Sequence, residues 1–109
     1  MHELAITQAI VEAAAARSGG AKVVRVVVEI GKLSGVMPDA LRFCFGPCCE
    51  GTPLAGATLD VEEPPGLAAC RACGDRFALE ALFGACACGS RDLDLISGRE
   101  LRVREMEVI

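Results

Sequence analysis

The sequence has 109 residues and a formal net charge of −4, from 15 acidic and 11 basic side chains. This length suits one domain or two very small ones, and the acidic balance argues against nucleic-acid binding, which would need a clustered excess of Lys and Arg. No apolar run approaches the roughly 20 residues of a membrane-spanning helix, and no signal peptide is recognisable. We therefore expect a soluble, cytoplasmic protein with neither nucleic acid nor membrane as partner.

The first third of the chain predicts a helix followed by a strand. Residues 4–17 are rich in Ala and place apolar side chains at the spacing of one helical stripe, and Ser18-Gly19-Gly20 ends this helix. Residues 22–30, KVVRVVVEI, are dense in β-branched side chains, which favour a strand. Strict alternation predicts one fully apolar face, made by Val24, Val26, Val28 and Ile30.

A second helix and a second strand follow. Pro38-Asp39 is typical of a helix start, and Gly46-Pro47 should kink or stop the helix. Residues 58–63 then alternate as a strand with Leu59 and Val61 directed inward. Pro64-Pro65-Gly66 is the clearest break in the chain, and we predict a domain boundary there.

The last strand, predicted over residues 100–109, changes its apolar phase along its length. Leu101 and Val103 have one parity and Met106 and Val108 the other, so a bulge near Arg104-Glu105 is expected. A lone terminal strand is unstable, so it should pair with the sheet of the first half. The predicted fold is α+β: a sheet of about three strands with two helices, formed by residues 1–64 and 97–109, and an inserted zinc-ribbon domain over residues 65–96.

The inserted segment carries two cysteine knuckles. Cys70 and Cys73 belong to a C-x-x-C-G sequence, and Cys86 and Cys88 to a C-x-C-G sequence. Thiolates at such spacing can grip one metal ion, and the glycines permit the left-handed backbone that aims amides at sulfur. Four thiolates predict a structural, tetrahedral Zn(II) site with no open position for catalysis. A short hairpin arm over residues 77–82 is expected to join the two knuckles. Arg71, Arg76 and Arg91 are close enough in sequence to offset its negative charge.

The remaining cysteines are less informative. The total of seven is odd, which a secreted disulfide framework would rarely use. Cys44 is expected in the second helix as a small hydrophobic side chain, and the vicinal pair Cys48-Cys49 could pack in the core or capture soft metals. Unliganded thiols and a thiol redox protein remain alternatives to the metal site.

The single histidine, His2, follows the initiator methionine. With a free Met1 amine, the amine and the His2 amide close a five-membered chelate ring, and the His2 amide and imidazole close a six-membered one. The Glu3 amide or carboxylate could complete four ligands, and square-planar nitrogen geometry suits Ni(II) or Cu(II). A histidine at this position is more often incidental, so the residues alone leave both readings open.

Several segments together carry a resemblance over essentially the whole chain: the MHE start, VVEIGKLSGVMPDALRF, EGTPLAGATLDVEEPPGLAAC and the terminal GRELRVREMEV. They resemble the HypA/HybF family of [NiFe]-hydrogenase nickel-incorporation proteins. The resemblance implies a metallochaperone, not an enzyme, that binds Ni(II) through His2, supported by Met1 and Glu3. It also implies that the ligands of a structural Zn(II) are Cys70, Cys73, Cys86 and Cys88.

The partners implied by the resemblance are a GTP-hydrolysing nickel chaperone, HypB, and a hydrogenase large-subunit precursor, with urease a further possible client. No P-loop sequence is present, so GTP hydrolysis would belong to the partner. The chain itself is expected as a monomer or weak homodimer. The competing hypothesis is a zinc-ribbon protein-interaction module that delivers no nickel and in which His2 has no role.

Overall fold

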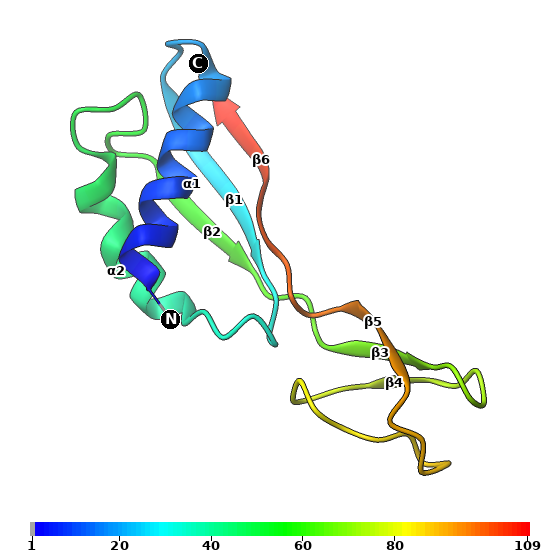
Figure 1. The fold of residues 1–109 in the computed structure, drawn as a ribbon. Helices are drawn as coiled ribbons and strands as arrows, with labels where there is room; N and C mark the ends of the chain where they lie inside the picture. Colours follow the sequence, from blue (N-terminus) through cyan, green and yellow to red (C-terminus); the bar gives the residue numbers. More distant parts are fainter. Residues whose placement is uncertain (1) are drawn as a thin grey trace.

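A computed structural model describes residues 2–109 as an elongated molecule of 53 × 23 × 16 Å (Figure 1). Two three-stranded sheets lie end to end, in the orders β2-β1-β6 and β4-β3-β5. Within the described residues, no helix is long and apolar enough to cross a membrane. The elements are α1 (Glu3–Ser18), β1 (Val23–Ile30), α2 (Pro38–Cys49), β2 (Thr58–Glu62), β3 (Leu67–Cys70), β4 (Arg76–Ala78), β5 (Leu93–Ser97) and β6 (Leu101–Val108).

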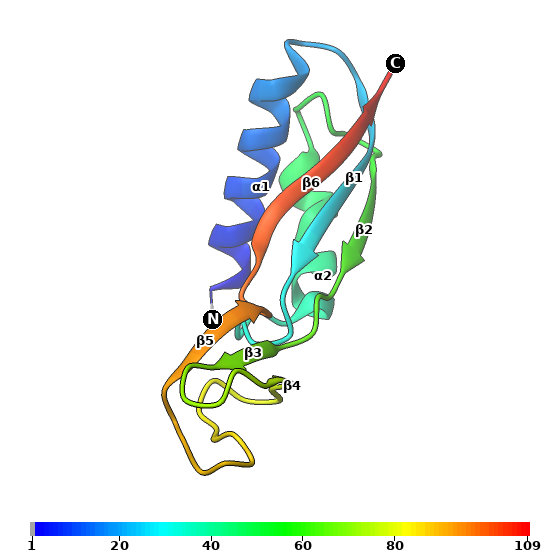
Figure 2. The same ribbon diagram turned by 90° about the vertical axis from the view of Figure 1, so that its right-hand side faces the viewer.

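The larger sheet carries both helices on one face (Figures 1 and 2). β1 is central, parallel to β2 and antiparallel to β6. Apolar side chains of α1, α2 and β1 form its core together with Leu54 of the loop after α2, and Leu41, Leu54 and Ile30 are almost completely buried. The predicted return of the last strand to the first sheet is confirmed, as is the α+β class with its small sheet and two helices.

The predicted bulge in β6 is also present. Val27 is opposite Glu105 while its neighbour Val28 is opposite Val103, so Arg104 is the extra residue. The shift lets Val103 and Met106 both pack against the core although they are three positions apart, a spacing that puts residues of a regular strand on opposite faces. The change of apolar phase along the sequence is therefore explained by one inserted residue.

Two details differ from the sequence prediction. A register irregularity between Val23 and Arg25 brings Val23 into the core in place of Val24. Helix α2 continues through Pro47 to Cys49. Proline removes only one hydrogen bond in this last turn, and Cys49, which is 2% exposed, gains core contacts by extending the helix.

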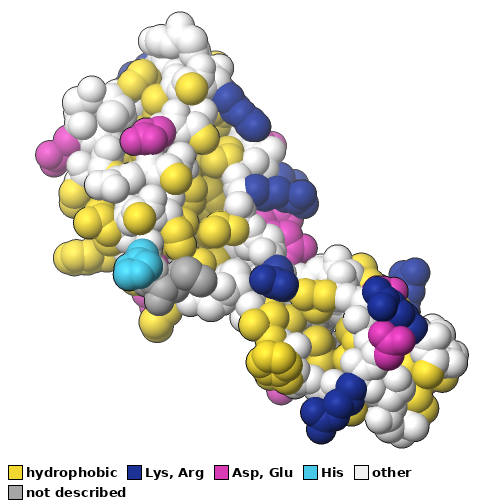
Figure 3. Space-filling model, viewed as in Figure 1, with side chains coloured by type: hydrophobic (Ala, Val, Ile, Leu, Met, Phe, Trp, Pro, Cys, Tyr) yellow, Lys and Arg dark blue, Asp and Glu magenta, His cyan; other side chains and the backbone are white. Residues whose placement is uncertain are grey.

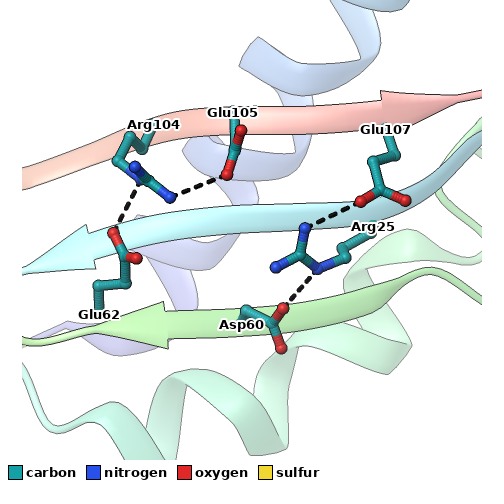
Figure 4. Close-up of polar contacts among 6 residues, drawn as sticks. All are labelled: Arg25, Asp60, Glu62, Arg104, Glu105 and Glu107. Carbon is teal, nitrogen blue, oxygen red and sulfur yellow. Dashed lines mark hydrogen bonds and ion pairs between the residues drawn. The ribbon is translucent and has the colours of Figure 1, made fainter.

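The outer face of the larger sheet is covered by ion pairs (Figure 4). Arg25 of β1 pairs with Asp60 of β2 and with Glu107 of β6. Arg104 of β6 pairs with Glu62 across the sheet and with its neighbour Glu105. Val27 lies beneath this layer and is only 1% exposed. These are surface pairs of small individual energy, but they fix the positions of long side chains along both edges of β1.

The loop after β1 packs against the smaller sheet and holds the two sheets together. Leu33 of this loop packs against Ala68 and Leu79 of the smaller sheet, and its amide donates to the Gly98 carbonyl at 2.7 Å. The contact is close: a Cβ added at Gly66 would lie 2.0 Å from the Leu79 oxygen and 2.6 Å from the Leu33 side chain. The junction therefore depends on a glycine and on one inserted leucine.

Candidate metal centres

The four cysteines of the two knuckles converge at the end of the smaller sheet. Their sulfur atoms all lie within 4.8 Å of one another. The Sγ atoms of Cys70 and Cys88 are 3.7 Å apart, and those of Cys73 and Cys86 are 3.5 Å apart. Zinc–sulfur bonds of about 2.3 Å in a tetrahedron separate the sulfurs by about 3.8 Å. The donor set and the spacing both fit one tetrahedral zinc ion.

Local backbone geometry produces this convergence. In the first knuckle Gly74 has φ +80° and its amide donates to the Cys70 carbonyl at 2.8 Å. In the second knuckle Gly89 has φ +93° and its amide donates to the Cys86 carbonyl at 2.8 Å. Each turn needs a left-handed residue, which glycine adopts without steric cost. The shorter C-x-C spacing is therefore accommodated by a tight turn that brings both sulfurs to the same side.

Strand pairing sets the distance between the knuckles. The first knuckle is itself the turn between β3 and β4, and β5 pairs with the other edge of β3. The hairpin that the sequence suggested within residues 77–82 is thus formed around the cysteines, because Phe77 pairs back to Ala68. The sheet therefore holds the first knuckle beside β5, the strand that follows the second knuckle.

The backbone also prepares one sulfur for metal binding. The amide of Cys73, followed by that of Ala72, donates to the Cys70 sulfur and lowers the pKa of this thiol to about 6. Burial opposes the effect, since Cys70 is only 3% exposed. Ligand thiols must be deprotonated, so the lowered pKa of Cys70 favours the form in which it would bind a metal ion.

Arg71, which was expected to offset the charge of the thiolates, forms ion pairs with two carboxylates. Its guanidinium contacts Asp94, and its Nη1 donates to the Asp92 carboxylate at 3.2 Å. The same contact lowers the pKa of the Asp94 carboxyl. Because Asp92 and Asp94 follow the second knuckle, Arg71 ties the two knuckles together through carboxylates.

The predicted nickel residues lie at the start of α1, far from the thiols in sequence. His2 occupies the N-cap position, makes no side-chain capping hydrogen bond and is exposed. In Figure 3 its imidazole is at the surface, where the helical layer ends. Met1, the other predicted terminal ligand, lies outside the described residues.

The Glu3 side chain is engaged in the fold. Its Oε2 accepts a hydrogen bond of 3.0 Å from the amide of Met37, the N-cap residue of α2. This bond is the main reason that the pKa of the Glu3 carboxyl is lowered. The Thr7 hydroxyl donates to the Glu3 carbonyl at 2.7 Å and fixes the first turn. Glu3 thus anchors the amino terminus of α1 to that of α2.

The other three cysteines do not form a comparable centre. Cys44 and Cys48 are half-buried and Cys49 is buried in the larger core. Burial, with a smaller contribution from Cys48, raises the pKa of the Cys49 thiol to about 11. Among residues 2–109, the knuckle cysteines are the group of three or more ligand side chains close enough to share an ion.

Comparison with known proteins identifies the family. Residues 1–108 match the family model described as hydrogenase/urease nickel incorporation, metallochaperone, hypA. The chain belongs to the HypA family. A hydrogenase maturation factor HypA from Trichormus variabilis is 58% identical over 108 residues, covering 99% of this chain and 96% of that protein. One from Geotalea uraniireducens is 50% identical over 109 residues and covers 99% of both chains.

The fold agrees with this family assignment. The solution structure of the Ni metallochaperone HypA from Helicobacter pylori matches with a TM-score of 0.68 at 27% identity, covering 100% of this chain and 98% of that one. A second solution structure of a HypA protein matches with a TM-score of 0.70, also at 27% identity. The HypA family is one of nickel-incorporation metallochaperones, and the comparisons give no support to an interaction module without nickel.

Two contributions to these centres were not found from the sequence. Leu33, which completes the small core beneath the knuckles, is one leucine in a Gly- and Ser-rich connection without periodicity. The bond from Met37 to Glu3 joins residues 34 positions apart. The one available signal was the general preference of acidic side chains for the amino terminus of a helix, which would favour Glu3 beside the start of α2.

Proposed function

We propose that this chain delivers Ni(II) to a [NiFe]-hydrogenase precursor, binding the ion at its amino terminus and holding a structural Zn(II) at the four knuckle cysteines. The observation that carries the proposal is the match of residues 1–108 to a nickel-incorporation family, combined with an exposed His2 that makes no capping hydrogen bond. Nickel is the cargo in this account, and zinc is a resident ion.

The start of a helix is a suitable place for the proposed nickel chelate. The first four amides of a helix have no intrahelical acceptor, so recruiting the backbone nitrogens of His2 and Glu3 as ligands breaks no helix hydrogen bond. The Met1 amine and the His2 imidazole complete a set of four nitrogens, which suits Ni(II). Because the Glu3 carboxylate is bonded to the Met37 amide, we assign the amide nitrogen of Glu3, not its carboxylate, to the metal.

A site made of one short terminal segment also suits delivery. Its ligands can be exchanged one at a time with those of an acceptor, whereas a closed cage would retain the ion. Binding releases protons from the amine, the imidazole and the amides, so nickel affinity should fall as the pH falls. We propose HypB as the GTP-hydrolysing partner and the large-subunit precursor of a hydrogenase as the acceptor, with urease a second candidate client.

The proposed zinc ion supplies a cross-link between the knuckles. Cys70, Cys73, Cys86 and Cys88 would hold it as thiolates, and four sulfur ligands leave no open position for substrate. A maturation role without catalysis agrees with this closed donor set. The ion would contribute folding free energy to the smaller sheet directly.

Calorimetric titration of the untagged, zinc-loaded protein with Ni(II) tests the nickel assignment. His2→Ala should abolish the nickel isotherm because it removes the imidazole that closes the six-membered ring. Gln8→Ala, an exposed position further along α1, is the matched control and should bind as the wild type does. Unchanged nickel affinity in the His2 variant would show that the site is elsewhere.

Glu3→Gln separates the two candidate ligands of residue 3. Glutamine retains the backbone amide but loses the carboxylate, so nickel should still bind with the same stoichiometry. The Met37 amide should exchange faster with solvent in this variant, because its acceptor is weaker. Loss of nickel binding in Glu3→Gln, with an unaltered exchange rate at Met37, would instead identify the carboxylate as the ligand.

A further inference from the structure

β6 ends the larger sheet at an edge that pairs with no other strand of the described chain. It is eight residues long, contains no proline and forms the free side of the sheet in Figure 1. Its inward-facing residues are all apolar, since Leu101, Val103, Met106 and Val108 are paired with the core residues of β1. Edges of this kind present unpaired N–H and C=O groups and can accept a further strand.

The sequence of β6, LRVREMEV, is complementary to itself when two copies run in opposite directions. If Arg104 is placed opposite Glu105 of the second copy, every other pair also matches in character. Charges of opposite sign are then paired, and apolar residues meet apolar ones. The remaining pairs are Arg102 with Glu107, Val103 with Met106, and Leu101 with Val108.

The bulge makes this match possible in three dimensions. In a regular strand, residues 102 and 107 would be on opposite faces. In β6 the extra residue Arg104 resets the phase, so that Arg102 is opposite Glu29 and Glu107 is opposite Arg25. Glu29 and Arg25 share the outer face of β1, and both their partners make ion pairs there. Residues that would meet across the edge are therefore on the same face.

We propose that β6 pairs antiparallel with β6 of a second copy of this chain, about a two-fold axis that passes between Arg104 and Glu105. The result is a continuous six-stranded sheet in the order β2-β1-β6-β6-β1-β2, with both helical layers on one face. Such an isologous contact uses the same surface twice and closes as a dimer.

Charge complementarity on the outer face supports this partner. Within one chain, Glu29 pairs with Arg102, and Arg25 pairs with both Glu107 and Asp60. Joining two edges places Arg102 beside the partner's Glu107, so the signs alternate from Glu29 across the interface to the partner's Asp60. Arg104, held by Glu62, meets the partner's Glu105. Figure 4 shows part of this row in one copy, with Glu107, Arg25 and Asp60 side by side and Arg104 next to Glu105.

The inner face supports the same register. A groove of about 230 Å³ lies between α1 and β6 and is lined by Ile6, Ala9, Ala13, Leu101 and Val103, among others. Leu101 is 45% exposed and Val108 is 48% exposed in the single chain. The proposed pairing brings the partner's Met106 and Val108 beside Val103 and Leu101, which covers apolar surface at this groove.

Neighbouring arrangements are unfavourable. Moving the antiparallel register by one residue in one direction places Arg104 opposite the partner's Arg104, and in the other direction places Glu105 opposite the partner's Glu105. Either shift also places Val103 opposite a glutamate. A parallel pair in register opposes every charge to a like charge, which is destabilising in cross-strand positions. The sequence of β6 therefore favours the proposed register over these neighbours.

A charge-exchange experiment with the full-length protein tests the proposal. Sedimentation velocity over a concentration series should give a reversible dimer for the wild type. Arg102→Glu opposes two glutamates across the axis, and Glu107→Arg opposes two arginines. Each mismatch occurs twice in the dimer, so each single variant should dimerise about tenfold more weakly or worse. Arg76→Glu on β4, an exposed position with no part in this edge, is the control and should dimerise normally.

Mixing the two single variants is the decisive arm. In a mixed dimer the new acidic side chain of the Arg102→Glu chain meets the new basic side chain of the Glu107→Arg chain. The other contact joins the unaltered Glu107 of the first chain to the unaltered Arg102 of the second, so dimerisation should be restored. Restoration cannot come from repaired contacts within a chain, because the variants remain mismatched with Glu29 and Arg25 in their own sheets.

Three results would overturn the proposal: a wild type that stays monomeric, single variants that dimerise normally, or a mixture that stays monomeric. The wild-type series needs no variant, and thermal unfolding checks that each variant is folded.

Discussion

The larger sheet is stabilised by apolar side chains that two helices bury against it, whereas the smaller sheet has only Leu33, Ala68 and Leu79 as a buried apolar cluster. One of these three residues, Leu33, belongs to the loop after β1 and not to the smaller sheet itself. Its strands are short, with three residues in β4 and four in β3. A core of this size is insufficient for independent stability. The larger sheet therefore depends on apolar burial, whereas we propose that the smaller one depends on metal coordination by the four cysteines.

The largest expected effect is the loss of the proposed zinc ion. Cys73→Ser removes one of the four sulfur ligands, and because binding free energy is folding free energy in such small metal domains, residues 67–97 should unfold. The larger sheet should remain folded because its core does not include the knuckles. Amide hydrogen exchange resolved along the chain measures this directly.

Retention of both zinc and amide protection in Cys73→Ser would contradict this assignment. Ala87→Ser lies between two cysteines of the second knuckle and is exposed. It is the matched control, and it should keep zinc and protection.

The second largest effect is expected from a substitution in the core of the larger sheet. Leu41 on α2 is 0% exposed in the larger core, whereas Phe43 on the same helix is 84% exposed. Leu41→Ala should lower the free energy of unfolding by about 2–5 kcal/mol through lost burial and a cavity. Phe43→Ala should change it by less than about 0.5 kcal/mol. Denaturant unfolding followed by circular dichroism measures both, and similar losses in the two variants would contradict the assigned core.

A smaller effect is expected at the junction between the regions. Leu33→Ala should remove the inserted side chain from the smaller sheet and cost about 2 kcal/mol. The loss should be confined to protection of β3, β4 and β5, with the larger sheet unchanged. Lys32→Ala, the exposed neighbour, should have no such effect. An equal loss of protection in both sheets would mean that they unfold as one unit.

Most of the fold could be predicted because the relevant patterns are local. The apolar phase change in β6 placed the bulge near Arg104-Glu105, and the spacing of Cys70 and Cys73 located a knuckle. The extension of α2 through Pro47 was not predictable in the same way, since the burial of Cys49 outweighs the local cost of a proline. The insertion of Leu33 and the bond from Met37 to Glu3 depend on tertiary contacts that no local pattern encodes.

The candidate nickel site lies between these cases. His2 is easily seen, but one imidazole at a chain start has no spacing that could distinguish a ligand from an incidental residue. Its placement at the N-cap of α1, where backbone amides are free of helix hydrogen bonds, adds a physical reason for chelation. The knuckle cysteines carry their own evidence in their sulfur–sulfur distances.

The central claim is that the two metals occupy separate sites, nickel at the amino terminus and zinc at the four cysteines. Elemental analysis of both metals per chain, after loading and desalting the untagged protein, tests it most directly. One residue added before Met1 should remove nickel and leave one zinc, because it displaces the terminal amine from the chelate ring while the knuckles are untouched. A chain with this addition that still holds one nickel, or that loses zinc together with nickel, would contradict the account.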